Sequence, residues 1–276
     1  MPEFGHCQFS DINTAQLALF SSKLLHEKHL AVKTARDILS LFHKIVTDMS
    51  VWSNGTTKQI TVIYPKPEFT KFRVLTSEEQ NRLTDYLNHE TDIYKFAILL
   101  SLTTGLRIGE ICGLRWRDIS AESNTVSVAH TVQRIKNPDK TGEKKTILQL
   151  GTPKTQYSNR TIPLTDGMVV LCNHFSKNPD FFILISSSKY ADPRSLQRKL
   201  KLYTKDLNLQ GVHFHTLRHT FATRCVEVGY DIKTLNEILG HSSISMTLNR
   251  YVHPNLDLKR ENMKKLEQAG FGCVVR

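Results

Sequence analysis

Four side chains suited to phosphoryl-transfer chemistry lie close together near the C-terminal end of the sequence. His215 and Arg218 stand three residues apart, and His241 precedes Tyr251 by ten residues. A tyrosine hydroxyl, with a pKa of about 10, attacks a phosphate diester at neutral pH only if the phosphate is polarised and the hydroxyl proton is accepted. Arginine meets the first condition and histidine the second. The set therefore predicts a site that binds a phosphate diester and attacks it.

Two further cations precede this set in the chain. Arg107 lies in the segment T-G-L-R-I-G-E, and Lys154 lies in the segment P-K-T. Arg107 is the natural partner of Arg218, because two guanidinium forks can hydrogen-bond the phosphate oxygens and stay charged as the pentacovalent state gathers negative charge. We expect Lys154 to lie in a turn between strands. Glu110 is predicted to be structural and to orient Arg107 or its neighbours.

Each of these residues also has an ordinary interpretation. Alone, Arg107 would usually be a surface or salt-bridging arginine and Lys154 a solvated lysine, and Tyr251 could be a core aromatic. His215 and His219 are four residues apart and resemble a zinc pair, but Thr216 stands where H-E-x-x-H has its glutamate. We therefore predict no metal site and interpret His219 as a packing or supporting histidine. His213 and His253 are predicted to flank the site without joining it.

The charge of the chain suits a nucleic acid as partner. The net charge is +11, and residues 1–50 are neutral, with five basic and five acidic residues, so all the excess lies in residues 51–276. Residues 134–160 carry seven Lys and Arg against two acids, and residues 189–205 carry six against one. A solvated surface without a partner is the alternative. The residues predicted to contact DNA are Lys144, Lys145, Arg160, Arg194, Arg198 and Lys199.

Composition restricts the class of protein further. The five cysteines are scattered and form no C-x-x-C pair, which argues against a disulfide framework and indicates thiols in a reducing cytoplasm. The sequence shows no bilayer-length apolar run and no signal peptide, so we expect a cytoplasmic protein without a membrane partner. It also shows no P-loop and no paired acidic cluster. We predict no cofactor and no metal.

Periodicity and breakers divide the 276 residues into a small helical piece and a larger body. Helical spacing covers residues 13–27 and 32–49, and it fails over 51–73. The spelling T-S-E-E at 76–79 predicts a helix to about Asn88, followed by a buried helix over 91–104 that Gly105 ends and a short one over 108–114. Alternation predicts strands over 125–128, 145–148 and 160–163. From there to about Gln268 the pattern is again helical, with Asp231 and Ser242 as N-caps and Gly229 and Gly240 as stops.

Five sequence motifs, in the order in which they occur, resemble those of the tyrosine recombinases, or phage integrase family. They are T-G-L-R-I-G-E, P-K-T, S-N-R-T-I-P, the H-x-x-R block and the His241 to Tyr251 segment, which together cover about residues 75–255. The resemblance implies an α+β, mainly α fold: a helical catalytic domain at 75–276 with a small three-stranded antiparallel sheet. It also implies a linker at 51–74 and a partial core-binding helical domain at 1–50, without the arm-binding domain of larger integrases.

The resemblance also implies roles for the site residues. Arg107 and Arg218 would be the catalytic arginines, Tyr251 the nucleophile and Lys154 the acid that protonates the departing 5′-oxygen. His215 would accept the tyrosine proton or hold the phosphate, and His241 would donate to a non-bridging oxygen. Cleavage would leave a 3′-phosphotyrosyl bond that a 5′-hydroxyl can reverse, without ATP or a metal.

At the level of the whole protein, the family resemblance implies a site-specific recombinase of a mobile element, bacterial or phage-encoded and nucleoid-associated when active. It would be a monomer when free and a homotetramer on two synapsed DNA duplexes, with an accessory directionality factor and a C-terminal helix, at 256–268, packed on a neighbouring protomer. Two other functions remain open: a DNA-binding remnant unable to assemble, and strand relaxation of the type IB topoisomerase kind. A histidine-based phosphodiesterase for small substrates would need turnover without a covalent enzyme intermediate.

Overall fold

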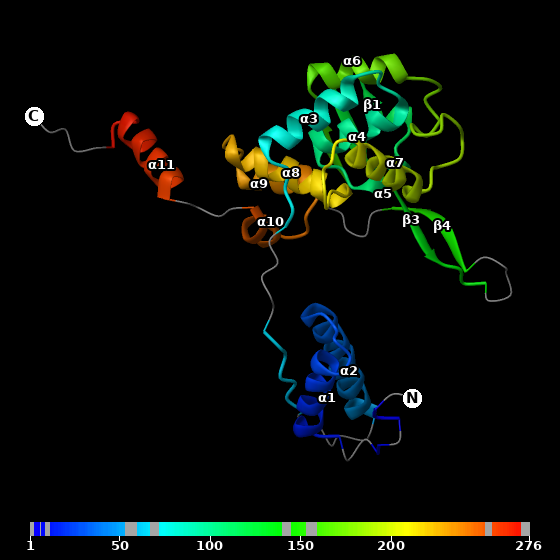
Figure 1. The fold of residues 1–276 in the computed structure, drawn as a ribbon, viewed down its shortest axis with the longest axis vertical. Coiled ribbons are helices and arrows are strands. Elements are labelled where there is room, and N and C mark those ends of the chain that lie inside the picture. Colours follow the sequence, from blue (N-terminus) through cyan, green and yellow to red (C-terminus); the bar gives the residue numbers. More distant parts are fainter. Residues whose placement is uncertain are drawn as a thin grey trace, which may run out of the picture. The chain divides into compact units, whose positions relative to one another are not determined.

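The computed structural model describes residues 3–5, 7–8, 12–52, 60–66, 72–139, 145–152, 159–251 and 256–271. The chain divides into two compact units, Met1–Lys71 and Phe72–Arg276 (Figure 1). This boundary falls within the stretch 51–74 that the sequence predicts to be a linker. Within the described ranges, no helix is both long and apolar enough to cross a membrane.

The first unit contains the two helices that periodicity predicts. They are α1 (Thr14–His26), which Asn13 and Gln16 begin with a capping box, and α2 (Val32–Trp52). Part of the predicted linker belongs to this unit, because Ile60 is buried in one cluster with Leu17 and Val46. The alternation of Ile60, Val62 and Tyr64 explains this: in an extended chain, every second side chain faces the same way.

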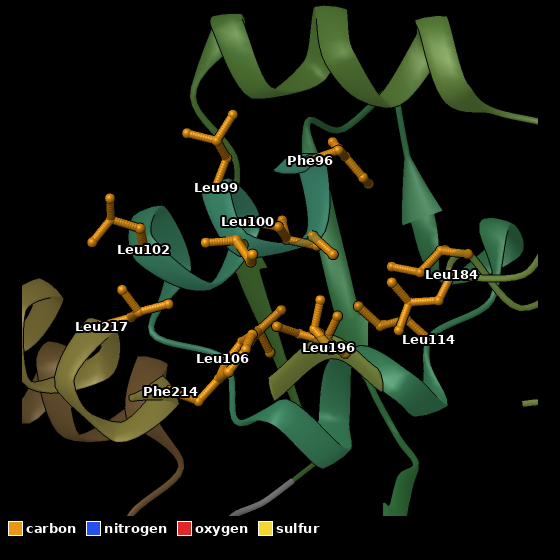
Figure 2. Close-up of a cluster of buried hydrophobic side chains, with 14 of the residues drawn as sticks. Phe96, Leu99, Leu100, Leu102, Leu106, Leu114, Leu184, Leu196, Phe214 and Leu217 are labelled. Atoms are coloured by element: carbon orange, nitrogen blue, oxygen red, sulfur yellow. The ribbon is translucent and has the colours of Figure 1, made fainter. Parts of the chain in front are cut away.

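The core of the second unit is built around a helix that is buried on nearly all sides. α4 (Ile93–Thr104) begins at Asp92, whose carboxylate accepts from two backbone amides, and ends at Gly105 with φ +67°. Figure 2 shows Phe96, Leu100 and Leu106 pointing into one apolar cluster with side chains from α7 (Pro193–Asp206) and α8 (Phe214–Glu227). α3 (Ser77–Asn88) lies beside α4 and has the predicted capping box of Thr76 and Glu79.

The mainly helical fold with a small antiparallel sheet is confirmed, but one predicted strand belongs elsewhere. The three-stranded sheet has the order β1-β2-β5, from β1 (Ile119–Ser120), β2 (Thr125–Val128) and β5 (Arg160–Pro163). The segment predicted at 145–148 is β4 (Thr146–Gly151), which pairs instead with β3 (Thr131–Lys136). Alternation in the sequence does not indicate β3, because Gln133, Arg134 and Lys136 interrupt the pattern of apolar residues.

Close packing joins the β3–β4 hairpin to α5 (Ile108–Gly113), the short helix that follows Gly105. A Cβ added to Gly109 would lie 2.6 Å from the carbonyl oxygen of Val132 and 2.7 Å from Oγ1 of Thr131. Only a residue without a side chain fits there. The hairpin therefore packs directly against α5, the helix that Arg107 precedes.

Helices complete the second unit, as predicted. α6 (Asp166–Phe175) follows the sheet, and α9 (Ile232–Leu239) begins at Asp231 and ends at Gly240 with φ +61°. α10 (Ile244–Tyr251) begins one residue later than predicted, because Ser243, and not Ser242, accepts from the amide of Ser245. α11 (Leu256–Gln268) reaches the predicted end.

Candidate active site

Local helix capping brings Arg107 and Glu110 together. Arg107 directly precedes α5, and Glu110 is the third residue of that helix. Oε2 of Glu110 accepts from the backbone amide of Arg107 at 2.8 Å, and Oε1 accepts from Nη1 of the same residue at 2.8 Å. The carboxylate therefore orients the guanidinium of Arg107 while it caps the helix.

The carboxylate of Glu110 also pairs with Arg160 on β5. Nη1 and Nη2 of Arg160 donate to the two carboxylate oxygens at 3.1 and 2.8 Å, and both side chains are about 5% exposed or less. Burial by itself raises the pKa of Glu110, but the hydrogen bonds and charges of Arg160, Arg107 and Arg218 outweigh it and lower the pKa to about 2. Glu110 is thus ionised at any pH near neutrality.

The C-terminal end of α9 accepts from all three arginines. Nε of Arg160 donates to the carbonyl of Ile238 at 2.6 Å, and Nη2 of Arg107 donates to that of Gly240 at 3.3 Å. Between them, Arg218 donates to the carbonyl of Leu239 and, through Nη1, to that of Gly105 at 2.7 Å. These carbonyls carry the negative end of the helix dipole. They hold cations side by side that would otherwise repel one another.

The cluster carries more positive than negative charge. Among the residues that the structure describes, three guanidiniums meet a single carboxylate, which leaves a formal charge of +2. Arg218 is only 4% exposed, and burial together with the charge of Arg107 lowers its pKa to about 9, so it remains charged at neutral pH. A cluster of this kind is suited to an anion such as a phosphate diester.

Tyr251 reaches the same region from the end of α10. The side chain is 7% exposed and packs with Ala222, Cys225 and Leu239, and the carbonyl of Leu239 accepts from Arg218. Its hydroxyl lies 2.7 Å from Nδ1 of His219 on α8. Tyr251 is therefore a buried aromatic that packs beside the arginine cluster.

Of the two histidines one turn apart on α8, the contact to Tyr251 comes from His219. His215 is exposed, and its ring centroid lies 6.2 Å from that of His219. The sequence predicts only a packing or supporting role for His219. Its spacing of four from His215 was the available signal, since it puts both rings on one face of the helix.

His241 is fixed by a chain of buried hydrogen bonds. The side-chain amide of Asn236 donates to the backbone carbonyl of His241 at 3.1 Å, so its oxygen is the atom that accepts from the hydroxyl of Thr247 at 2.9 Å. That hydroxyl has used its only proton, so Nδ1 of His241, 2.9 Å away, must donate to it. A proton therefore stays on Nδ1. A pocket of about 540 Å³ lies beside these hydrogen bonds, and its lining includes Arg160, Asn236 and His241.

The other predicted residues have different places. Lys154 and Lys144 lie outside the described residues, and so does His253. Lys145, Arg194 and Arg198 are exposed, while Lys199 lies over the ring of Tyr94 at 5.1 Å. Arg160, predicted to contact DNA, has its side chain buried against Glu110, because β5 packs on α9 and the guanidinium reaches the carboxylate on α5.

Comparisons with known proteins show the family of this chain. The model of the phage integrase family matches residues 73–257. A XerC-like tyrosine recombinase from Caldanaerobacter subterraneus subsp. tengcongensis is 30% identical over 89% of this chain and 68% of its own length. The transposase of transposon Tn916 from Enterococcus faecalis is 28% identical over 84% of this chain, which spans 60% of that relative.

Solved structures show the same fold. A fragment of the Tn1549 transposon integrase, in complex with a circular intermediate DNA, superposes with a TM-score of 0.73 at 24% identity, over 96% of this chain and 89% of that one. A lambda integrase dimer bound to a core site gives a TM-score of 0.57 at 18% identity, over 88% of this chain and 65% of that one. The family match covers Arg107, His215, Arg218, His241 and Tyr251. This chain belongs to the phage integrase family, the tyrosine recombinases that carry out site-specific DNA recombination.

Proposed function

We propose that this chain cleaves and rejoins duplex DNA at specific sites through a 3′-phosphotyrosyl bond to Tyr251. The observation that carries the proposal is a buried tyrosine whose hydroxyl is hydrogen-bonded to a histidine. Its ring packs against Leu239, whose carbonyl accepts from one of three arginines around a carboxylate. Tyrosine supplies the nucleophile, and the excess positive charge stabilises the charge that develops on the phosphate.

Each side chain has a part in this reaction. Arg107 and Arg218 bind the non-bridging oxygens, and Glu110 with Arg160 holds them in position. His215, exposed at the N-terminal end of α8, contacts the phosphate, and His241 is the second histidine of the site. Lys154 protonates the departing 5′-oxygen. Its assignment rests on sequence order alone.

Integration or excision of a mobile element is the biological role that the relatives favour. The transposases of Tn916 and Tn1545 are transposon proteins by name, and several similar structures are integrase complexes with DNA. We propose DNA as the partner and a homotetramer on two synapsed sites as the active form. α11 would dock on a neighbouring protomer through apolar side chains that include Met263 and Leu266, which are 64% and 44% exposed.

Covalent trapping tests the chemistry. The protein is incubated in EDTA with a pool of nicked duplexes that carry candidate sites, and denaturation-resistant protein–DNA bands are counted. Tyr251→Phe should abolish the band and keep DNA affinity, since it removes a hydroxyl and no charge. Tyr230→Phe is the matched control, because Tyr230 is exposed and should leave the band unchanged. A band that persists with Tyr251→Phe would refute the assignment of the nucleophile.

Two outcomes separate the competing functions. Relaxation of supercoiled DNA without preference for any sequence would identify a type IB topoisomerase activity. Tight DNA binding without a covalent band on any site would identify a DNA-binding remnant. A band on a restricted set of sites, together with strand exchange between them, is the result we expect.

A further inference from the structure

We propose that His219, and not His215, is the catalytic residue that accepts the proton of Tyr251 during cleavage and returns it during rejoining. This inference rests on the proposed function and adds a residue to the reacting set. It starts from one contact: Nδ1 of His219 lies 2.7 Å from the hydroxyl oxygen of Tyr251, within hydrogen-bond distance.

The surroundings of the pair favour direct proton transfer. His219 and Tyr251 are each 7% exposed, so little water competes for the hydroxyl proton. The ring of Phe72 packs against His219, with centroids 4.7 Å apart, and covers it with an apolar group. His219 also follows Arg218 directly in the chain, so the helix that holds the phosphate-binding guanidinium holds the base as well.

His215 is less well placed for this step. Its side chain is exposed at the N-terminal end of α8, whereas that of His219, one turn further along the helix, is buried against the hydroxyl of Tyr251. An exposed imidazole at a helix N-terminus is suited to hold an incoming phosphate, which keeps the role proposed for it above. The two histidines thus divide two tasks between them, one turn apart on α8.

The proton balance of the step closes without a co-reactant. The Oη–P bond forms as the Oη–H proton moves to Nδ1 of His219, and the P–O5′ bond breaks with its electron pair going to O5′, which takes a proton from Lys154. In rejoining, the 5′-hydroxyl attacks phosphorus and returns its proton to Lys154, while the imidazolium of His219 gives its proton back to the departing tyrosine oxygen. A group that titrates near neutral pH can work in both directions.

Substitution by asparagine separates proton transfer from positioning. In His219→Asn, the amide occupies the place of Nδ1 and can still hydrogen-bond Tyr251, but it cannot accept a proton at neutral pH. We expect single-turnover cleavage to fall by roughly 10²- to 10⁴-fold, the usual contribution of general base catalysis, with DNA affinity unchanged. His213→Asn, on an exposed residue next to α8, is the matched control and should cleave normally.

The pH profile of cleavage carries the decisive readout. Among the described residues, the titratable and charged groups near His219 include Tyr251 on α10, with Arg218 and His215 on α8 itself. Wild type and His215→Ala should share one step in the pH–rate profile of single-turnover cleavage, and His219→Asn should lose that step. The proposal would be overturned if His215→Ala lost this step and His219→Asn retained it.

A modified substrate distinguishes the base from the acid. A 5′-phosphorothiolate makes the departing group a thiolate that needs no proton, so Lys154→Ala should regain cleavage on it and His219→Asn should not. Rescue of His219→Asn would show that His219 acts at the departing oxygen, and the proposal would fail. If Tyr251→Phe still forms the covalent bond, the proposed function fails instead, so the two failures are distinct.

Discussion

Glu110→Gln should destabilise the second unit by an amount that follows from the ion pairs of Glu110. The carboxyl has a pKa of about 2 in place of its ordinary 4.5, and the side chain is 4% exposed. Each pKa unit corresponds to ~1.4 kcal/mol, so ionised Glu110 contributes about 3 kcal/mol to the free energy of unfolding. This agrees with the ~3–5 kcal/mol lost when one partner of a buried ion pair is removed.

The sign of the pH dependence follows from the lowered pKa. The unfolded chain protonates Glu110 near pH 4.5, whereas the folded chain does so near pH 2. The contribution is therefore complete above pH 4.5 and is lost as the pH falls toward 2. The difference in free energy of unfolding between wild type and Glu110→Gln should be constant between pH 5 and pH 8, and it should shrink below pH 4.5.

Thermal unfolding followed by circular dichroism measures this difference. A loss of about 3 kcal/mol should lower the Tm by about 6–12 °C in a unit of this size. Glu122→Gln, an exposed glutamate in the turn before β2, is the matched control and should change the Tm little. A Tm for Glu110→Gln within 2 °C of wild type at pH 7, or a difference that already narrows between pH 7 and pH 5, would refute the reasoning.

Three further changes test other parts of the structure. Gly109→Ala should lower the free energy of unfolding in chemical denaturation by roughly 1–3 kcal/mol, because the added Cβ would lie 2.6 Å from a carbonyl oxygen of β3. Gly167→Ala in α6 is the control and should cause no loss, because its Cβ would have no atom within 4 Å beyond its own helix backbone and chain neighbours. Sulfate should raise the Tm of wild type more than that of Arg107→Ala, and equal responses would argue against an anion site. Arg198→Ala should weaken DNA binding and reduce the salt slope by about 1, while Arg117→Ala, whose guanidinium is ion-paired, should change it less.

Features set by neighbouring residues could be predicted from the sequence. The capping box of Thr76 and Glu79 begins α3 as expected, and Gly105 ends α4 with a positive φ. Both depend on contacts within four residues, where the order of residue types is enough. The link of Glu110 to Arg107 is equally local, since they are three residues apart on the first turn of α5.

Features that depend on tertiary neighbours could not be predicted in this way. Arg160 lies 50 residues from Glu110, and its basic surroundings in the sequence suggested a surface residue, yet the pairing of β5 with β2 turns it inward. The same applies to His219, because periodicity gives the helix face that it shares with His215 but not which ring meets Tyr251. Only the packing of α10 on α8 decides that.

The segment from Ile238 to Ser243, which comprises the end of α9 and the turn to α10, joins the parts of the proposed site, although it carries no arginine of its own. Its three successive carbonyls, from Ile238 to Gly240, each accept from a different guanidinium. The next residue is His241, whose Nδ1 keeps its proton for Thr247. Nε2 can therefore donate to a phosphate oxygen only when the ring takes up a second proton. The excess positive charge of the arginine cluster disfavours this protonation, and the arrival of an anionic phosphate favours it. In the proposed reaction, substrate binding would therefore convert His241 into a hydrogen-bond donor that acts together with the arginines.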